Sequence, residues 1–144
     1  MNTSAGGVPV KASVGKSMQG NTSQDTKPEL ILRRAMWNHG LKGYRVNCRK
    51  VPGTPDICHR RLKLAIFVHG CFWHRCPSCN LPLPKTNTDF WRSKFDRNRQ
   101  RDERVLSELD SDGWHVEVVW ECSLRGKTAD IEGILHQLEA YWGG

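Results

Sequence analysis

The sequence predicts a single α/β domain in which helices flank a small mixed sheet. Two runs, "LKLAIFVHG" at 62–70 and "WHVEVVW" at 114–120, have the length and the apolar, β-branched composition of buried strands. Stretches with helix start and stop signals stand before, between and after these runs. The predicted order is helix, strands, helix, strand, helix, and the fold becomes α+β if the segments near 44–58 form a hairpin.

The first helix is expected within residues 25–40, "DTKPELILRRAMWNHG". Pro28 fits the first helical turn, Glu29 suits the positive N-terminal end, and Gly40 ends the helix. Four apolar residues of this helix are predicted to face the core: Leu30, Ile31, Ala35 and Met36.

A short strand and a turn come before the strongest strand. "YRVNC" at 44–48 is expected to form the short strand, and "VPGTPD" at 51–56 the turn. The run at 62–70 is apolar enough to be buried on both faces, so we expect it at the centre of the sheet. A loop rich in Pro and Asn, at 79–87, then leads to the second helix.

The second helix is expected over 88–110, and Gly113 ends it before the strand at 114–120. Its middle, "RSKFDRNRQRDER", offers basic side chains to phosphates, although a charge run of this kind is usually a solvated face. The last helix, "TADIEGILHQLEAYW" at 128–142, is amphipathic, and we expect Thr128 to cap it.

The charge balance favours a polyanionic partner. Of the 144 residues, 22 are Lys or Arg and 15 are Asp or Glu, which gives a formal net charge of +7. Nucleic acid is the first candidate for such a partner, although many soluble proteins are equally basic. Residues 1–20 are small and polar and are expected to form a flexible arm, while 21–144 form the single domain.

The sequence indicates a cytoplasmic protein. Residues 1–27 lack the apolar stretch of a signal peptide, and no segment approaches the ~18 apolar residues of a membrane helix. Cytoplasmic thiols stay reduced, so clustered cysteines there suggest a metal before a disulfide. Of the six cysteines, Cys48 and Cys58 stand in or next to predicted strands and are interpreted as core residues.

The other cysteines predict a zinc site. Cys71, Cys76 and Cys79 are close in sequence, and Cys122 follows the strand "VEVVW". Four thiolates bind zinc tetrahedrally and would join a loop to a strand end. His74 is an alternative fourth ligand that the spacing does not exclude, and we favour the four-cysteine set.

Asp56 is a candidate ligand for a hard divalent cation such as Mg²⁺. It follows a proline turn, "PGTPD", and a buried strand begins a few residues later. His69 and His74 end that strand and would lie near Asp56 if the two segments pair. Either histidine could accept a proton from water, and Asp102 could orient one of them.

Three aromatic residues are candidates for DNA contacts. Phe72 and Trp73 are adjacent in a predicted loop, and Trp91 lies in the first turn of the second helix. Exposed aromatic rings near a phosphate site can stack on bases or wedge between them. The alternative is that these rings pack over the zinc loop.

Five segments together resemble one known family, the very-short-patch repair (Vsr-type) endonucleases. The segments are "GNTSQDTKPE", "PGTPD", "IFVHGCFWHRCPSC", "TDFWRSKFDRNRQRDERV" and "GWHVEVVWECSLRG", which together span most of residues 15–127. The resemblance implies a restriction-endonuclease-like fold with a structural zinc. It also implies an Mg²⁺-dependent nick in double-stranded DNA 5′ to the thymine of a T·G mismatch, which arises when 5-methylcytosine deaminates. The enzyme would be monomeric and could hand its product to host mismatch-repair proteins.

The resemblance also implies roles for individual residues. Asp56 resembles the metal-binding aspartate, and Val68 stands where a backbone carbonyl binds Mg²⁺. His74 resembles the general base that activates water, with Asp102 as its orienting partner. His69 resembles a second active-site histidine near the scissile phosphate.

The remaining correspondences concern the DNA wedge, the zinc and the supporting residues. Phe72, Trp73 and Trp91 resemble the aromatic wedge that enters the duplex, while Glu29 and Asn98 resemble supporting residues around the catalytic metal. The residues at or near the zinc-ligand positions are Cys71, Cys76, Cys79 and Cys122. Two other classes stay open on the residues alone: a zinc-stabilised DNA-binding module without catalysis, and a related nuclease for another lesion or for both strands.

Overall fold

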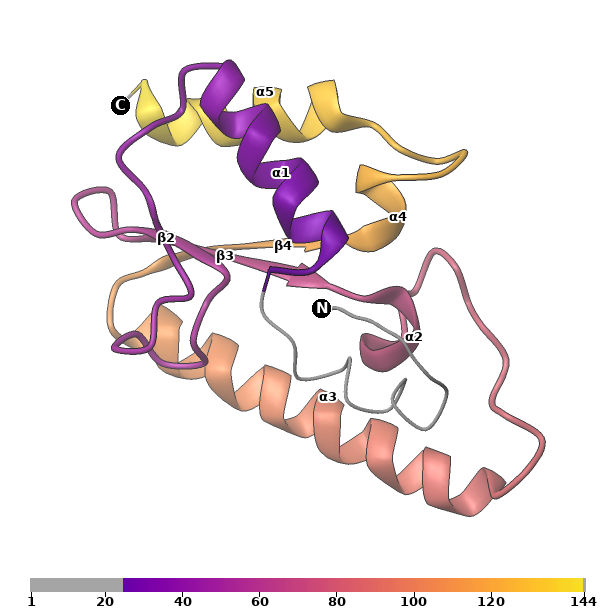
Figure 1. The fold of residues 1–144 in the computed structure, drawn as a ribbon. Coiled ribbons are helices and arrows are strands. Elements are labelled where there is room, and N and C mark those ends of the chain that lie inside the picture. The colour runs from indigo at the N-terminus through magenta and orange to yellow at the C-terminus, as the bar shows by residue number, and fades with distance from the viewer. Residues whose placement is uncertain (1–24, 144) are drawn as a thin grey trace.

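A four-stranded mixed sheet in the order β1-β2-β3-β4 lies at the centre of the fold (Figure 1). The computed structural model describes residues 25–143, so the arm predicted at 1–20 lies outside the described part. β1 pairs with β2 and β2 with β3 in antiparallel fashion, whereas β3 and β4 are parallel. The strands are β1 (Arg45–Val46), β2 (Ile57–His59), β3 (Leu64–His69) and β4 (His115–Trp120).

Helices cover both faces of the sheet. α1 (Lys27–Asn38) and α5 (Ile131–Trp142) lie on one face, and the long α3 (Thr88–Ser111) crosses the other (Figure 1). Two short helices, α2 (Cys71–His74) and α4 (Glu121–Leu124), begin directly after β3 and β4. No helix within residues 25–143 is both long and apolar enough to cross a membrane.

Most of the predicted elements are present. The antiparallel β1–β2 pair is the hairpin that the sequence left open, and β3 is central, as expected. The strand expected at 44–48 is shorter than predicted, because only Arg45 and Val46 pair with β2. The strand expected at 114–120 lies at the edge of the sheet, and Val119 is its one buried residue.

The buried face of α1 is shifted from the predicted one. Leu32 and Met36 have no exposed surface, whereas Leu30 is 47% exposed, so the prediction that Leu30 faces the core was wrong. Ile31 and Ala35 are partly buried at the margin of the core. The consecutive apolar residues 30–32 allow more than one helical phase, and packing against the sheet selects the phase that buries Leu32.

The predicted cap of the last helix was also wrong. Asp130, not Thr128, is the N-cap of α5, and its side chain accepts a hydrogen bond from the Gly133 amide at 3.1 Å. The Thr128 hydroxyl donates instead to the Cys122 carbonyl, at 2.7 Å. Both residue types cap helices well, and the contact with Cys122 decides between them.

Two further local predictions are corrected. Phe72 and Trp73 were expected in a loop, but they form the middle of α2, a single helical turn that begins right after β3. Cys48 and Cys58 are buried, as expected of core residues, but they are also joined by a disulfide across the β1–β2 hairpin.

Candidate active site

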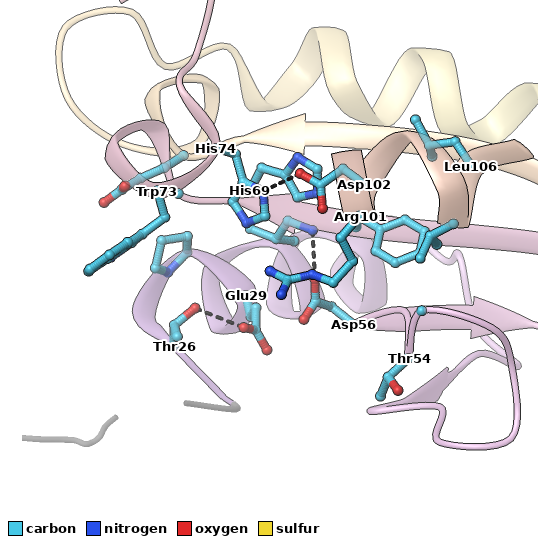
Figure 2. Close-up of a pocket in the computed structure, with 17 residues that line it drawn as sticks. Thr26, Glu29, Thr54, Asp56, His69, Trp73, His74, Arg101, Asp102 and Leu106 are labelled. Carbon is cyan, nitrogen blue, oxygen red and sulfur yellow. Dashed lines mark hydrogen bonds and ion pairs between the residues drawn. The ribbon is translucent and has the colours of Figure 1, made fainter. Parts of the chain in front are cut away.

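Asp56 reaches the end of β3 because β2 and β3 are antiparallel. Ile57 pairs with Ile66, so Asp56, one residue before β2, lies next to the last residues of β3. Its Oδ2 accepts a hydrogen bond from the Val68 amide at 2.7 Å (Figure 2). This hydrogen bond fixes the Asp56 carboxylate beside the C-terminal end of β3. The proline turn in the sequence predicted a fixed position for it.

Glu29 supplies a second carboxylate beside Asp56. It is only 4% exposed, and it accepts hydrogen bonds from the Thr26 hydroxyl at 3.0 Å and from Arg33 at 3.2 Å. Burial, together with the nearby charge of Glu29, raises the pKa of Asp56 to about 7. A buried acid beside a partly buried one favours a cation between or beside them.

His69, His74 and Asp102 form a second group, here called the histidine cluster. The two imidazole rings stack with their centroids 3.8 Å apart and an interplanar angle of 5°. His74 Nδ1 lies 2.7 Å from Asp102 Oδ2 (Figure 2). The structure thus brings Asp102, the proposed orienting carboxylate, directly to His74.

The environment sets the charge of these groups. Burial lowers the pKa of His69 to about 4, with a further contribution from the charge of His74, so that His69 is neutral at pH 7. Burial opposes ionisation of Asp102, but the hydrogen bond with His74 and the positive charges nearby outweigh it, and the pKa of Asp102 is lowered. An ionised carboxylate can only accept, so His74 Nδ1 donates to it.

One face of α3 carries the residues that meet the site. Trp91, Phe95, Asn98 and Asp102 recur at intervals of three or four and therefore share that face. The amide of Asn98 donates to the Trp73 carbonyl at 3.4 Å, and Arg101 donates to the amide oxygen of Asn98 at 3.1 Å. Asn98 therefore supports α2 from below, and it does not contact Asp56.

A cavity of about 400 Å³ unites the two groups of ionisable residues. Asp56, Glu29 and the histidine cluster all line it, together with Val68 and Trp73. The sequence interpretation missed Arg101, which also lines the cavity. Its position one residue before Asp102 was the available signal, but the surrounding run of charges hid it.

The aromatic residues form one mutually packed group beside the cavity. Phe72 lies 5.0 Å from Trp73 and 5.7 Å from Trp91, measured between ring centroids. All three side chains are partly buried, and the exposed aromatic of the group is Phe90, at 54%. The rings thus pack over α2 and still present one edge to solvent.

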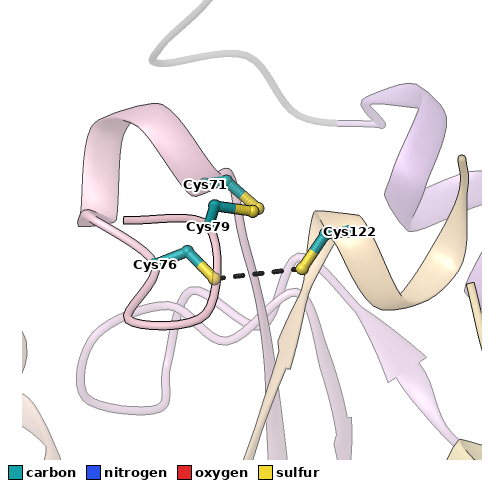
Figure 3. Close-up of side chains that lie close together, drawn as sticks. All are labelled: Cys71, Cys76, Cys79 and Cys122. Carbon is teal, nitrogen blue, oxygen red and sulfur yellow. Dashed lines mark hydrogen bonds between the residues drawn. The ribbon is translucent and has the colours of Figure 1, made fainter. Parts of the chain in front are cut away.

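The four predicted zinc-ligand cysteines also meet, in a group here called the cysteine cluster. β3 and β4 are parallel and pair His69 with Trp120, so Cys71 and Cys122, two residues further on, emerge at the same edge. Cys76 Sγ lies 3.8 Å from Cys122 Sγ (Figure 3). The sulfur atoms of Cys71, Cys76, Cys79 and Cys122 all lie within 4.8 Å of one another.

His74 is not part of the cysteine cluster. Within the described residues, two groups of three or more His, Cys or acidic side chains have their ligand atoms within 4.8 Å of one another: the cysteine cluster and the histidine cluster, and His74 belongs to the latter. The geometry therefore favours four cysteines, the first of the two alternatives that the spacing left open. His74 remains available for the cavity.

Two neighbouring carboxylates and a histidine–carboxylate pair that line one cavity are typical of the active site of a hydrolytic enzyme. Comparison with known proteins shows which family of enzymes the chain belongs to. A family model described as DNA mismatch endonuclease Vsr matches residues 8–81. The chain is 39% identical over 117 residues to the DNA mismatch endonuclease Vsr of Escherichia coli K12, an alignment covering 81% of this chain and 74% of that relative.

Two nicking enzymes are similar to the same extent. Identity is 43% over 106 residues to the type II nicking enzyme V.NmeAIP of Neisseria meningitidis serogroup A, covering 73% of this chain and 74% of the relative. Identity is 42% over 108 residues to the type II nicking enzyme V.XorIIP of Xanthomonas oryzae pv. oryzae, an alignment covering 74% of this chain and 78% of that relative. The chain belongs to the Vsr family of DNA mismatch endonucleases.

Proposed function

We propose that this protein nicks double-stranded DNA 5′ to the thymine of a T·G mismatch and so starts very-short-patch repair of deaminated 5-methylcytosine. The domain would be restriction-endonuclease-like. The observation that carries the proposal is the convergence of Asp56 and His74 on one cavity in a chain of this family. The rest follows from the chemistry of the residues that line the cavity.

The catalytic metal would be Mg²⁺, held by Asp56 and by the backbone carbonyl of Val68. The donors fit a hard cation, since the partly buried Asp56 lies beside the buried Glu29, and desolvation raises the pKa of Asp56 to about 7. The Val68 amide faces Asp56, and the amide and carbonyl of one strand residue point to the same side. When bound, the ion would stabilise charge on the phosphate under attack.

His74 would act as the general base. Its Nδ1 donates to Asp102, which leaves Nε2 as the atom that accepts a proton from the attacking water. Asp102 fixes the tautomer and the ring orientation and stabilises the imidazolium that forms. His69, neutral at pH 7 and stacked on His74, would lie near the scissile phosphate and donate a hydrogen bond to it.

The aromatic group would detect the mismatch. Phe72, Trp73 and Trp91 pack into one partly buried block next to the cavity. Such a block can wedge into a duplex at a cost of a few kcal/mol per opened step, and a mismatched step costs less to open than a paired one. Asn98 holds the backbone of this block through the Trp73 carbonyl.

A structural zinc would occupy the cysteine cluster. The donor set fits, because four sulfur atoms from α2, its following loop and α4 converge within 4.8 Å. The ion would tie the end of β3 to the end of β4 and so hold α2 in place. We further propose that the enzyme is a cytoplasmic monomer whose product passes to host mismatch-repair proteins.

The test is nicking of a duplex with one T·G mismatch, against T·A and C·G controls, in the presence of Mg²⁺. We expect nicking of the thymine strand only at the mismatch, and a loss of about 10³-fold or more for Asp56→Ala, because the metal contributes several kcal/mol. Cutting that ignores the mismatch would contradict the repair function. Binding without cutting in several sequence contexts would favour a non-catalytic DNA-binding module.

A further inference from the structure

A second pocket lies at the opposite end of the sheet from the active site. It has a volume of about 400 Å³ and sits where the β2–β3 turn meets the segment before β1. β2 begins next to Asp56 and ends at His59, so its two ends face the two sites. The residues that line this basic pocket are Lys42, Gly43, Arg45, His59, Arg60 and Arg61.

The basic pocket contains cations without partners. Within residues 25–143, none of its lysine and arginine side chains forms an ion pair, and no acidic residue lines it. Four cations around one hollow repel each other unless an anion is bound.

The floor of the basic pocket is ordered before any ligand arrives. The indole Nε1 of Trp142 donates to the Lys42 carbonyl at 2.8 Å, and the Trp142 ring meets His59 edge-on at 5.3 Å. His59 is 7% exposed, and its Nδ1 accepts from the Leu62 amide at 3.3 Å. The C-terminal helix thereby fixes both sides of the pocket.

Gly43 keeps the basic pocket open. Its φ of +91° is strained for other residues, and a Cβ at this position would lie 2.9 Å from His59 Nε2. At the rim, the ammonium of Lys42 lies 4.5 Å from the ring centroid of Trp37, which is 54% exposed. An exposed aromatic ring beside several cations is typical of nucleic-acid contacts.

We propose that the basic pocket binds backbone phosphates of the DNA that flanks the nicked site. β3 spans the distance between the two sites with five steps of about 3.3 Å, or about 17 Å, which corresponds to about five base pairs of B-DNA. This inference rests on the proposed function, because it assumes a duplex seated at the active site. The contact would add affinity that is independent of sequence and sensitive to salt.

The experiment measures binding to a fluorescent 24-base-pair duplex with a central T·G pair, without divalent ions, across 50–200 mM salt. For Arg60→Gln/Arg61→Gln we expect the slope of log K against log salt to become shallower by about 0.9 for each phosphate that the protein no longer neutralises. The same change is expected on a fully paired duplex. The single-turnover nicking rate at saturating enzyme should stay that of the wild type.

Lys63→Gln is the matched control. Lys63 belongs to the same turn as Arg61, but its ammonium faces away and donates to the Asp112 carbonyl at 2.7 Å. Arg61→Gln and Lys63→Gln each remove one positive charge. We expect only Arg61→Gln to change the slope of log K against log salt. Equal slopes for both would overturn the proposal.

Two further outcomes distinguish a small anion from the DNA backbone as the bound phosphate, and failure of the proposed function from failure of the basic-pocket proposal. If pyrophosphate raises the Tm of the wild type but not of Arg60→Gln/Arg61→Gln while the salt slopes agree, the pocket binds a small anion and the DNA contact is overturned. If the wild type shows no preference for T·G, the proposed function fails. The slope difference on paired DNA would still support the contact with the basic pocket.

Discussion

The histidine cluster and the cysteine cluster lie at the two ends of the same helical turn, α2, yet they have different chemical settings. Cys71 begins α2, and its sulfur atom lies with those of two cysteines in the following loop and of Cys122 in α4. His74 ends α2 and turns to Asp102 on α3, across the cavity from Asp56. Residues that are interleaved in the sequence are thus sorted in space into a cluster of sulfur atoms and a set that lines the cavity.

The difference shows how one short segment can contribute both sulfur ligands for a metal and side chains that line the cavity. Sulfur ligands are soft and suit zinc, whereas the imidazole and carboxylate groups at the cavity suit proton transfer and a hard cation. Because α2 is only one turn long, a rigid anchor at Cys71 also restrains His74. We therefore expect substitutions in the two clusters to fail in different ways.

The largest effect is expected from His74→Asn. Loss of the proposed general base should slow nicking of a T·G duplex by about 10²–10⁴-fold, while Tm and zinc content stay those of the wild type. Single-turnover kinetics measures this effect. His136→Asn is the control, since the His136 side chain is 87% exposed on α5. Loss of zinc from the His74→Asn protein would contradict the assignment of His74 to the cavity and not to the metal site.

Cys76→Ser should fail in the opposite way. Cys76 is buried in the cysteine cluster, so its replacement should lower the zinc content and reduce Tm by about 10 °C or more, at roughly 2–4 °C for each kcal/mol. Mass spectrometry of the native protein and thermal unfolding measure the two quantities. Unchanged zinc and Tm would mean that the cysteines do not hold a structural metal.

Asp130→Ala separates general destabilisation from loss of the metal. Asp130 caps α5 through the Gly133 amide, so its truncation should cost about 1 kcal/mol and lower Tm by about 2–4 °C. The zinc content should not change. Thr128→Val is the control variant, because the Thr128 hydroxyl binds the Cys122 carbonyl and does not cap α5.

The smallest effect concerns pH and a histidine outside both clusters. Burial, with a contribution from Arg61, lowers the pKa of His59 below its usual 6.5. The unfolded chain therefore binds a proton first as pH falls, so the stability that neutral His59 provides is present above pH 6.5 and is lost below it. His59→Asn should reduce the fall in Tm between pH 8 and pH 5, and His136→Asn should not.

The sequence predicted the elements better than it predicted their contacts. β3, α1 and α3 were found because their patterns and end signals are local. In α1, Met36 is buried as predicted, but Leu30 was predicted to face the core where Leu32 does, since only the sheet selects the helical phase. Thr128 and Asp130 are both good caps, but the Thr128 hydroxyl binds the Cys122 carbonyl in α4, and Asp130 caps α5.

On the residues alone the site was predicted by residue type, and it was the family resemblance that implied Asp102 as the partner of His74. Whether His74 or Cys122 joined the other cysteines depended on the parallel register of β3 and β4, which is a pairing between segments far apart in sequence. The contact of Asp102 with His74 was only one option before the path of α3 was known. For Arg101, the position next to Asp102 was the one signal, and the surrounding run of charges hid it.

The most direct test of the division between the two clusters is X-ray absorption at the zinc edge of the native protein. The account predicts four sulfur neighbours at about 2.3 Å and no nitrogen. Three sulfurs and one nitrogen, with the nitrogen absent in His74→Asn, would contradict it. In that case His74 would hold the metal and could not serve as the base at the cavity.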